Sequence, residues 1–283
     1  MESTTREVVA ADGQVIVGKF FRPSSTPSAA VLIAPAMGAL QTYYSDFARW
    51  LADRGILAAT FDYRGVGLSR WGSLRGFDAD IMDWARLDCA AMIDAVAERS
   101  PGVPLYWIGH SLGGQIFPFV PNRERVAKFV TVATGSGYWR ENAAPLRRTV
   151  WWMWYVVVPL SLRSLGYFPG RRLRKVGDLP YGVMKQWRAW CLNPDYAVGA
   201  EGAQARAEYA SIAAPVVSLS FTDDEFMSAR NTESIHRHFS GATVTMKRIA
   251  PEDIGASRIG HFGFFRAKFE RALWADILLP ELA

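Results

Sequence analysis

The chain has 283 residues, of which 50% are hydrophobic and 21% are charged. This composition is typical of a folded protein with a sizeable core, and it excludes a disordered or low-complexity chain. The two cysteines, Cys89 and Cys191, are too few and too far apart for a disulfide framework or a zinc site. The sequence therefore implies no metal and no organic cofactor.

The amino-terminal segment carries Glu2, Arg6 and Glu7 before any apolar run, which is the wrong order for a secretory signal. The longest apolar stretch, residues 150–162, is interrupted by Pro159 and is shorter than the ~20 residues of a membrane-spanning helix. We therefore expect a cytoplasmic protein without a transmembrane segment.

The net charge of +5 is unevenly distributed along the chain. Residues 137–190 contain ten Lys or Arg against two acidic residues, whereas the rest of the chain has 22 basic and 25 acidic residues. The same segment holds six of the eleven tryptophans. Such a shift in composition indicates a separate unit, so we expect an insertion over residues 137–210 in a core of residues 1–136 and 211–283.

Outside the insertion, short apolar β-rich runs alternate with segments of helical periodicity. In chain order, we expect strands at 15–21, 30–34, 56–61, 105–108, 129–133, 216–221 and 243–249. We expect helices at 43–54, 81–99, 112–119, 228–239 and 264–279. Several strands are apolar on both faces, which is typical of a parallel sheet covered by helices on both sides. The fold class is therefore α/β, with ligands beyond the carboxyl ends of the strands.

The loop after the strand at 105–108 reads Gly109-His-Ser-Leu-Gly113 and leads into a helical segment. This G-x-S-x-G pattern is typical of a sharp strand-to-helix turn, in which a Cβ beside the strained serine would collide with backbone. Ser111 would then project over the sheet edge, with the Leu112 N–H and the helix dipole facing an anion formed there. The alternative is a glycine-rich helix start that Ser111 merely caps.

A serine hydroxyl needs a base to act as a nucleophile, and the chain has four histidines. His110 lies inside the turn and would point away from Ser111. His236 and His238 lie on an expected surface helix, where we interpret them as solvated. His261 remains as the candidate base, in a glycine-containing loop before the last helix, with capping or packing as its alternative role.

Three consecutive acids at 223–225 follow the strand at 216–221. Repulsion among carboxylates is costly unless one of them faces a cation such as protonated His261. We assign Asp224 as the acid that orients His261, with Asp223 as the alternative. One of the three is expected to cap or begin the next helix.

A second oxyanion donor must come from an earlier loop. The segment Pro35-Ala-Met-Gly38 follows the strand at 30–34, and its Met37 N–H is the best candidate.

These features together resemble the α/β-hydrolase superfamily, in its serine esterase, lipase and serine-aminopeptidase-like branch. Residues 109–113 look like the nucleophile elbow, Asp224 stands where the superfamily places its acid, and 260–262 look like its histidine loop. Residues 62–69 are similar to its D-x-R-G-x-G-x-S turn. The resemblance implies a mostly parallel sheet with helices on both faces and a helical cap inserted before the acid strand. Most relatives have His-Gly where this chain has Pro35-Ala36, a departure shared with uncharacterised α/β hydrolases that carry an Ala-Pro-Ala-Met-Gly segment.

We therefore predict a serine hydrolase that cleaves carboxylic esters through an acyl-enzyme. Ser111 would attack the carbonyl carbon, and His261, oriented by Asp224, would move the proton. The N–H groups of Met37 and Leu112 would hold the oxyanion. Peptidase, thioesterase and acyltransferase activities use the same parts, and a non-catalytic ligand-binding protein is the alternative from another class.

The composition of the expected cap suggests a class of substrate and a contact with membranes. Its run of aromatic residues at 151–155 suits a small-molecule ester with an apolar acyl or alcohol group, or else only packs the cap onto the core. The basic, tryptophan-rich cap also suits contact with an anionic membrane, against the alternative of a solvated lid. No nucleic-acid-binding module accompanies the charge, and the sequence leaves the oligomeric state open.

Overall fold

A computed structural model describes residues 2–282 and contains an eight-stranded sheet with the order β1-β2-β4-β3-β5-β6-β9-β10. The strands of this sheet are β1 (Glu2–Val9), β2 (Val15–Arg22), β3 (Ala29–Ala34), β4 (Ile56–Asp62), β5 (Leu105–His110), β6 (Val126–Val132), β9 (Val216–Phe221) and β10 (Val244–Ile249). β1 and β2 pair antiparallel, as do β2 and β4, and the neighbours from β4 to β10 are parallel. The expected α/β class with a mostly parallel sheet is confirmed.

The central strands are buried on both faces, as the continuous apolar sequence of β3 predicts. Every residue of β3, β4, β5 and β9 is buried. In β3, Ala30 and Leu32 belong to the hydrophobic cluster on one face of the sheet, and Val31 belongs to the cluster on the other. The strand β1 was not predicted, because its sequence is polar and mostly exposed at the edge of the sheet.

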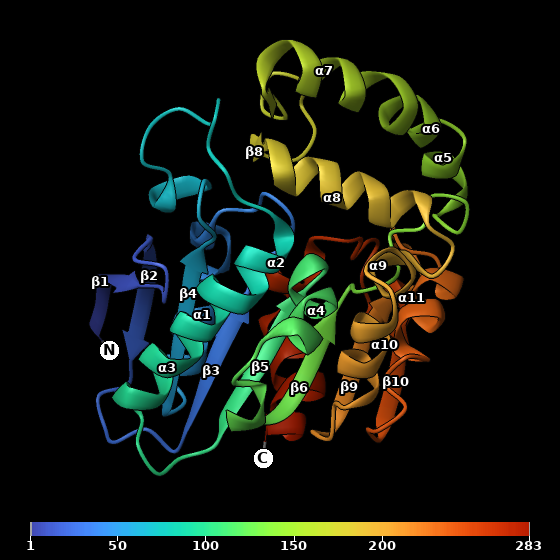
Figure 1. Ribbon diagram of the computed structural model, residues 1–283. Coiled ribbons are helices and arrows are strands. Elements are labelled where there is room, and N and C mark those ends of the chain that lie inside the picture. Colours follow the sequence, from blue (N-terminus) through green and yellow to red (C-terminus); the bar gives the residue numbers. More distant parts are fainter. Residues whose placement is uncertain (1, 283) are drawn as a thin grey trace.

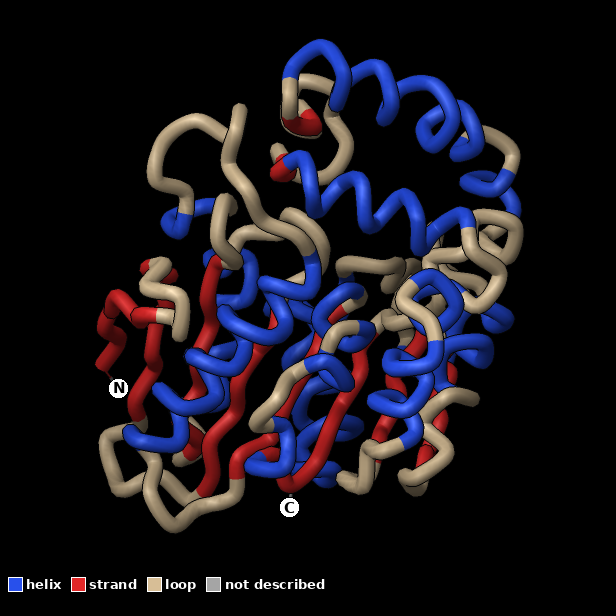
Figure 2. Tube along the Cα trace, in the orientation of Figure 1, coloured by secondary structure: helices blue, strands red, loops and turns tan. Residues whose placement is uncertain are grey.

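Helices cover both faces of the sheet (Figures 1 and 2). One cluster of core residues includes side chains of α3, α10 and α11, and the other includes side chains of α1 and η10. These helices are α1 (Ser45–Ala52), α3 (Ala90–Arg99), α10 (Ala203–Ala210), α11 (Ala229–His236) and η10 (Glu270–Leu278). The crossovers therefore bury the sheet between two helical layers.

Shorter helical segments extend or connect these helices. The helix expected at 81–99 includes a π-helical stretch, and the one expected at 264–279 consists of 3-10 and π turns. The short segments of the core are η1 (Gln41–Tyr44), η2 (Gly67–Ser69), α2 (Ile81–Asp83), η3 (Trp84–Cys89), α4 (Leu112–Gln115), η4 (Phe117–Phe119), η5 (Arg123–Arg125), η7 (Pro251–Ile254), η8 (Gly263–Phe265), η9 (Ala267–Phe269) and η11 (Leu279–Leu282).

The chain between β6 and β9 forms an arch of helices over one end of the sheet (Figure 1). Its elements before α10 are α5 (Ala144–Arg147), α6 (Val150–Trp152), η6 (Met153–Val157), α7 (Val158–Leu165), β7 (Tyr167–Phe168), β8 (Leu179–Pro180), α8 (Tyr181–Leu192) and α9 (Tyr196–Ala200). We call residues 143–192 the cap. The segment 193–210 includes α10, which packs on the core through Tyr209 against Phe119, with 5.6 Å between ring centroids.

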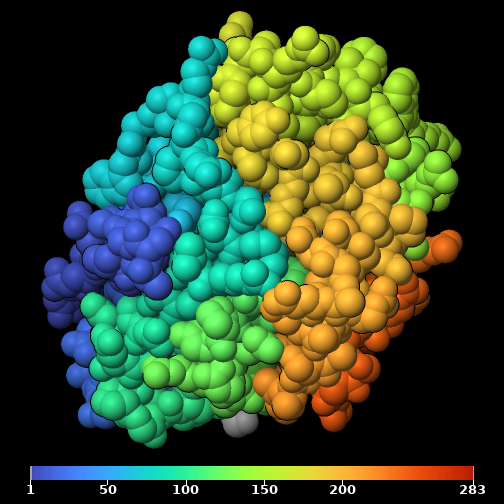
Figure 3. Space-filling view, viewed as in Figure 1, coloured from blue at the N-terminus to red at the C-terminus, as the bar shows by residue number. Residues whose placement is uncertain are grey.

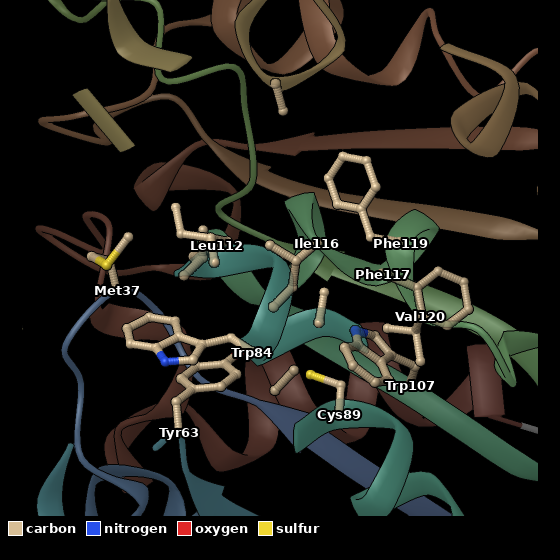
Figure 4. Packing of buried hydrophobic residues seen from close by; sticks show 14 of the residues in the cluster. Met37, Tyr63, Trp84, Cys89, Trp107, Leu112, Ile116, Phe117, Phe119 and Val120 are labelled. Atoms are coloured by element: carbon tan, nitrogen blue, oxygen red, sulfur yellow. The ribbon is translucent and has the colours of Figure 1, made fainter. Parts of the chain in front are cut away.

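The cap and the core share one hydrophobic cluster. The cap residues Trp154, Leu179 and Met184 belong to the same cluster as Met37 and Leu112 of the core. Figure 4 shows part of this cluster, with Met37 and Leu112 above the stacked rings of Tyr63 and Trp84. In the space-filling view of Figure 3 the cap, coloured yellow-green to gold, lies directly on the core.

The two cysteines lie in different parts of this interior. Cys89 is buried in η3 of the core, and Cys191 is buried near the end of α8, where the cap joins the core. Both thiols are free. No helix within residues 2–282 has the length and apolar character needed to cross a membrane.

Candidate active site

Ser111 occupies a strained turn between β5 and α4. Its backbone has φ 50° and ψ −109°, a combination that residues other than glycine rarely adopt. A Cβ on Gly109 would lie 2.4 Å from the Gly114 nitrogen, and a Cβ on Gly113 would lie 2.2 Å from the Ala34 oxygen. The two glycines are therefore required by close backbone approach. Ser111 makes no side-chain capping hydrogen bond to α4, so the alternative of a simple capping serine does not describe this turn.

Asp224 and His261 form a buried pair at the carboxyl ends of β9 and β10. The His261 Nδ1 and Asp224 Oδ2 atoms are 2.8 Å apart, and the two residues are 4% and 6% exposed. The other carboxylate oxygen, Oδ1, accepts hydrogen bonds from the backbone N–H groups of Phe226 and Met227, each at 2.8 Å. Both oxygens of Asp224 are thus engaged, which fixes the orientation of the His261 ring.

The two flanking acids hold the backbone of the loop that carries His261. Asp223 accepts hydrogen bonds from the N–H groups of Ile259 at 2.9 Å and Gly260 at 3.0 Å. Glu225 accepts one from the His261 N–H at 3.0 Å. The expectation that one of the three acids caps or begins the next helix is wrong, because Asp223 and Glu225 bind this loop and Asp224 binds the His261 ring and two N–H groups before the helix. Ser228 caps α11 instead.

The two expected oxyanion donors both lie next to the Ser111 turn in the fold. Leu112 is the first residue of α4, where an N–H has no acceptor within its own helix. The Met37 N–H likewise has no acceptor among residues 2–282. The side chains of Met37 and Leu112 also belong to one hydrophobic cluster, so both donors lie in an apolar part of the fold.

Two tyrosines that sequence reasoning missed hold the Pro35-Ala36 segment in place. The Tyr63 hydroxyl donates to the Pro35 carbonyl at 3.1 Å, and the Ala36 N–H donates to the Tyr44 hydroxyl at 2.9 Å. These bonds hold the Pro35-Ala36 segment against η1 and against the residue that follows β4. No sequence signal identified these bonds, because Tyr44 lies in the helix expected at 43–54 and Tyr63 in the turn at 62–69, and neither pattern says which polar groups meet.

The turn at 62–69 holds η1, the segment that follows the Pro35-Ala36 loop. The Asp62 carboxylate accepts hydrogen bonds from the Gln41 N–H at 2.8 Å, the Gln41 side-chain amide at 2.9 Å and the Leu68 N–H at 2.9 Å. A Cβ on Gly67 would lie 2.2 Å from Asp62 Oδ2, so glycine is required there. The D-x-R-G-x-G-x-S pattern therefore anchors η1, the segment that follows Met37.

Two of the other histidines are buried. His236 is 3% exposed, with Nε2 2.9 Å from the Thr131 hydroxyl and Nδ1 2.7 Å from the Thr232 carbonyl oxygen. The expectation that His236 is solvated is wrong, because this side of α11 packs on β6. Burial lowers the pKa of His236 to about 4. His238 is partly buried, and His110 is fully buried between Tyr44 and the His261 backbone.

Comparison with known proteins places the chain in a family. The family described as serine aminopeptidase, S33, matches residues 25–177, which is more than half of the chain. The chain belongs to this family of α/β hydrolases. The expected resemblance to the serine esterase, lipase and aminopeptidase-like branch is thereby confirmed.

Individual relatives are more distant. Human monoglyceride lipase is 30% identical over 109 residues, which cover 38% of this chain and 35% of the lipase. The chain thus spans about a third of the length of the curated relatives it matches. A soluble variant of Saccharomyces cerevisiae monoglyceride lipase has a TM-score of 0.63 at 15% identity, covering 88% of this chain and 86% of that one. A Bacillus coagulans carboxyl esterase has a TM-score of 0.60 at 14% identity, covering 88% and 90%. These structures share the fold.

Proposed function

We propose that the protein is a serine hydrolase that cleaves carboxylic esters, with Ser111, His261 and Asp224 as its triad. The observation that carries the proposal is the buried 2.8 Å contact between His261 Nδ1 and Asp224 Oδ2. It supports a proton-carrying base held in one tautomer. The strained turn at Ser111 supports its role as the nucleophile, and the N–H groups of Met37 and Leu112, which have no backbone acceptor among residues 2–282, support an oxyanion site.

The proposed reaction has two halves. Ser111 Oγ bonds to the ester carbonyl carbon while His261 Nε2 takes the hydroxyl proton, and the carbonyl electrons move onto the oxygen. When the oxyanion collapses, the alcohol leaves with the proton from His261, and an acyl-enzyme remains. Water then repeats the sequence and releases the carboxylic acid. Asp224 stabilises the imidazolium in both halves without taking its proton.

The apolar surroundings suggest the class of ester. Phe226 packs edge-on against the His261 ring, with 4.9 Å between centroids, and the shared cluster of cap and core borders Met37 and Leu112. Such a site suits an ester with an apolar acyl or alcohol group. Because the curated relatives are named monoglyceride lipases, monoacylglycerols are the first natural esters to test.

The test compares wild type and Ser111→Ala on p-nitrophenyl esters of rising acyl length. Loss of the nucleophile is expected to lower turnover by about 10⁴- to 10⁶-fold without unfolding the protein. Labelling by a fluorophosphonate probe should disappear in the same variant, which separates an enzyme from a non-catalytic binder. Retention of more than about a tenth of wild-type activity removes Ser111 from the mechanism. Aminoacyl p-nitroanilides, acyl thioesters and alcohol acceptors test the peptidase, thioesterase and acyltransferase alternatives.

We also propose that the cap contacts anionic membrane surfaces. Residues 142–177 contain seven Arg or Lys and no acidic residue. The first helical stretch of the cap exposes Trp151, Trp152 and Tyr155, with exposed fractions of 46%, 53% and 52%. Exposed aromatic rings beside unopposed cations are the combination that interfacial elements use.

A further inference from the structure

Two adjacent tyrosines of η1 connect two loops of the candidate active site. We call residues 35–40, which carry Met37, the β3–η1 loop, and residues 258–262, which carry His261, the histidine loop. Tyr44 reaches both of them through buried hydrogen bonds. Tyr43 reaches the histidine loop directly.

The Tyr44 connection runs through His110. The Tyr44 hydroxyl lies 2.9 Å from the Ala36 nitrogen and 2.9 Å from His110 Nδ1. His110 Nε2 lies 3.1 Å from the His261 carbonyl oxygen. Tyr44 and His110 are both 0% exposed, so no water competes for these bonds.

The direction of each hydrogen bond in this chain follows from its ends. The His261 carbonyl can only accept, so His110 Nε2 carries a proton and donates it. Burial lowers the pKa of His110 well below its ordinary value, and the neighbouring His261 lowers it further, so the ring is neutral and Nδ1 accepts. The Tyr44 O–H therefore donates to Nδ1, and its oxygen accepts from the Ala36 N–H. Each donor in this series of hydrogen bonds has one acceptor.

Tyr43 adds a second, shorter connection. Its hydroxyl donates to the Phe262 carbonyl, and its ring packs edge-on against that of Phe262 with 5.9 Å between centroids. Tyr43 thus holds the Phe262 carbonyl directly, and its neighbour Tyr44 holds the His261 carbonyl through His110. The Gln41 side chain ties the start of η1 to Asp62 and to the Val17 carbonyl, so this segment is itself anchored.

The sheet alone does not set the spacing of these two loops. β3 leads into the β3–η1 loop and β10 precedes the histidine loop, and the sheet places β5, β6 and β9 between them. The proposed chemistry needs the two loops in fixed register, because oxyanion donors must lie 2.7–3.1 Å from the developing charge while the base reaches the nucleophile. A displacement of about 1 Å can cost about 100-fold in rate.

We propose that Tyr43 and Tyr44, with His110, are positioning residues that fix the distance between the oxyanion donor Met37 and the base His261. The inference rests on the proposed function, since it assigns the two loops to one reaction. It adds to that function a pair of side chains that touch neither substrate nor the reacting atoms.

The test compares Tyr44→Phe with a matched control, Tyr209→Phe. Tyr209 is also 0% exposed, and its hydroxyl donates to the Gln115 carbonyl at 2.5 Å, between α10 and α4. Both variants lose one buried hydroxyl, so both should lower the melting temperature. Tyr44→Phe is expected to lower kcat for an ester by about 10- to 100-fold with KM nearly unchanged, whereas Tyr209→Phe should leave kcat unchanged. Equal kcat in the two variants overturns the proposal.

A second readout does not depend on turnover. The proton on His261 Nδ1 faces Asp224, and its downfield NMR resonance reports the geometry of that pair. Tyr44→Phe should shift or broaden this resonance, and Tyr209→Phe should not. An unchanged resonance in Tyr44→Phe would contradict the proposed positioning role of Tyr44. If Ser111→Ala hydrolyses esters at the wild-type rate while the His261 resonance changes in Tyr44→Phe, the proposed function is wrong and the positioning role of Tyr44 is still supported.

Tyr43→Phe keeps the test decisive should Tyr44→Phe fail to fold. Tyr43 is only partly buried, so its substitution is the milder one. Loss of its bond to Phe262 is expected to lower kcat by several-fold and to shift the His261 resonance. Unchanged values for both overturn the proposal as well.

Discussion

At the scale of single residues, neighbouring carboxylates take different tasks because of what each oxygen faces. Asp224 faces the His261 ring, while Asp223 faces two backbone N–H groups of the same loop. The first contact decides which imidazole nitrogen carries the proton, and the second decides where the loop lies. Two adjacent substitutions should therefore have effects of different kinds.

Asp224→Asn is expected to leave a folded protein whose ester turnover falls roughly 10⁴-fold, because an amide that donates to Nδ1 favours the wrong tautomer. Asp223→Asn, its matched control, keeps one oxygen for the loop and should lose far less. Steady-state kinetics with circular dichroism check both variants. The reverse ranking would move the orienting role to Asp223.

At the scale of elements, the face that α11 turns to the sheet makes stability depend on pH. His236 must be neutral to stay buried against Thr131, and its pKa is about 4 in the folded protein against about 6.5 in the unfolded chain. The unfolded chain therefore binds more protons between these values. The stabilising effect of the neutral ring is complete above pH 6.5 and decreases as the pH falls toward 4.

We expect this residue to account for about 3 kcal/mol of the loss in unfolding free energy between pH 7 and pH 4. Urea titrations at both pH values measure it. His236→Gln should show a smaller loss than wild type, and His238→Gln, at a less buried position of the same segment, should change the loss less. A loss in His236→Gln as large as in wild type would show that other groups cause it.

Agreement between sequence and structure also differs by element. β3 and β5 were predictable because strands buried on both faces leave a nearly continuous apolar run, and the turn at 109–113 was predictable because only glycine fits its close approaches. β1 lacks such a signal, since a polar edge strand reads as a loop.

Contacts distant in sequence escaped prediction for another reason. The bonds from Tyr44 to His110, from His110 to His261 and from Tyr43 to Phe262 join residues 66, 151 and 219 positions apart. Local periodicity carries no information about which buried polar groups will meet. The same limit explains His236, whose burial depends on the packing of α11 against β6.

At the scale of the whole molecule, charge separates the cap from the core. A cap that meets lipid should bind vesicles with anionic lipid and not neutral ones, because each Lys or Arg near such a surface contributes ~1 kcal/mol. The attraction fades within a Debye length of ~8 Å, so added salt should release the protein. Co-sedimentation at low and high salt measures both effects.

A charge-matched pair of variants tests where the binding charge lies. The first replaces four of the ten basic residues of 137–190 by Gln, namely Arg171, Arg172, Arg174 and Lys175. The control replaces four exposed basic residues of the core, namely Arg6, Arg22, Lys268 and Arg271. Only the first should lose vesicle binding, and neither should change hydrolysis of a small soluble ester. Equal losses would assign the effect to net charge, and absence of binding at low salt would leave the cap a solvated lid.

The placement of the two free thiols offers a way to time the opening of each part separately. Cys191 is 1% exposed at the base of the cap, and Cys89 is 0% exposed within the core. A thiol must reach solvent before an alkylating reagent can react. In Cys89→Ala the alkylation rate of Cys191 therefore measures separation of the cap, and in Cys191→Ala the alkylation rate of Cys89 measures opening of the core. If the cap separates while the core stays folded, Cys191 should be alkylated faster than Cys89, and the measurement needs no added label.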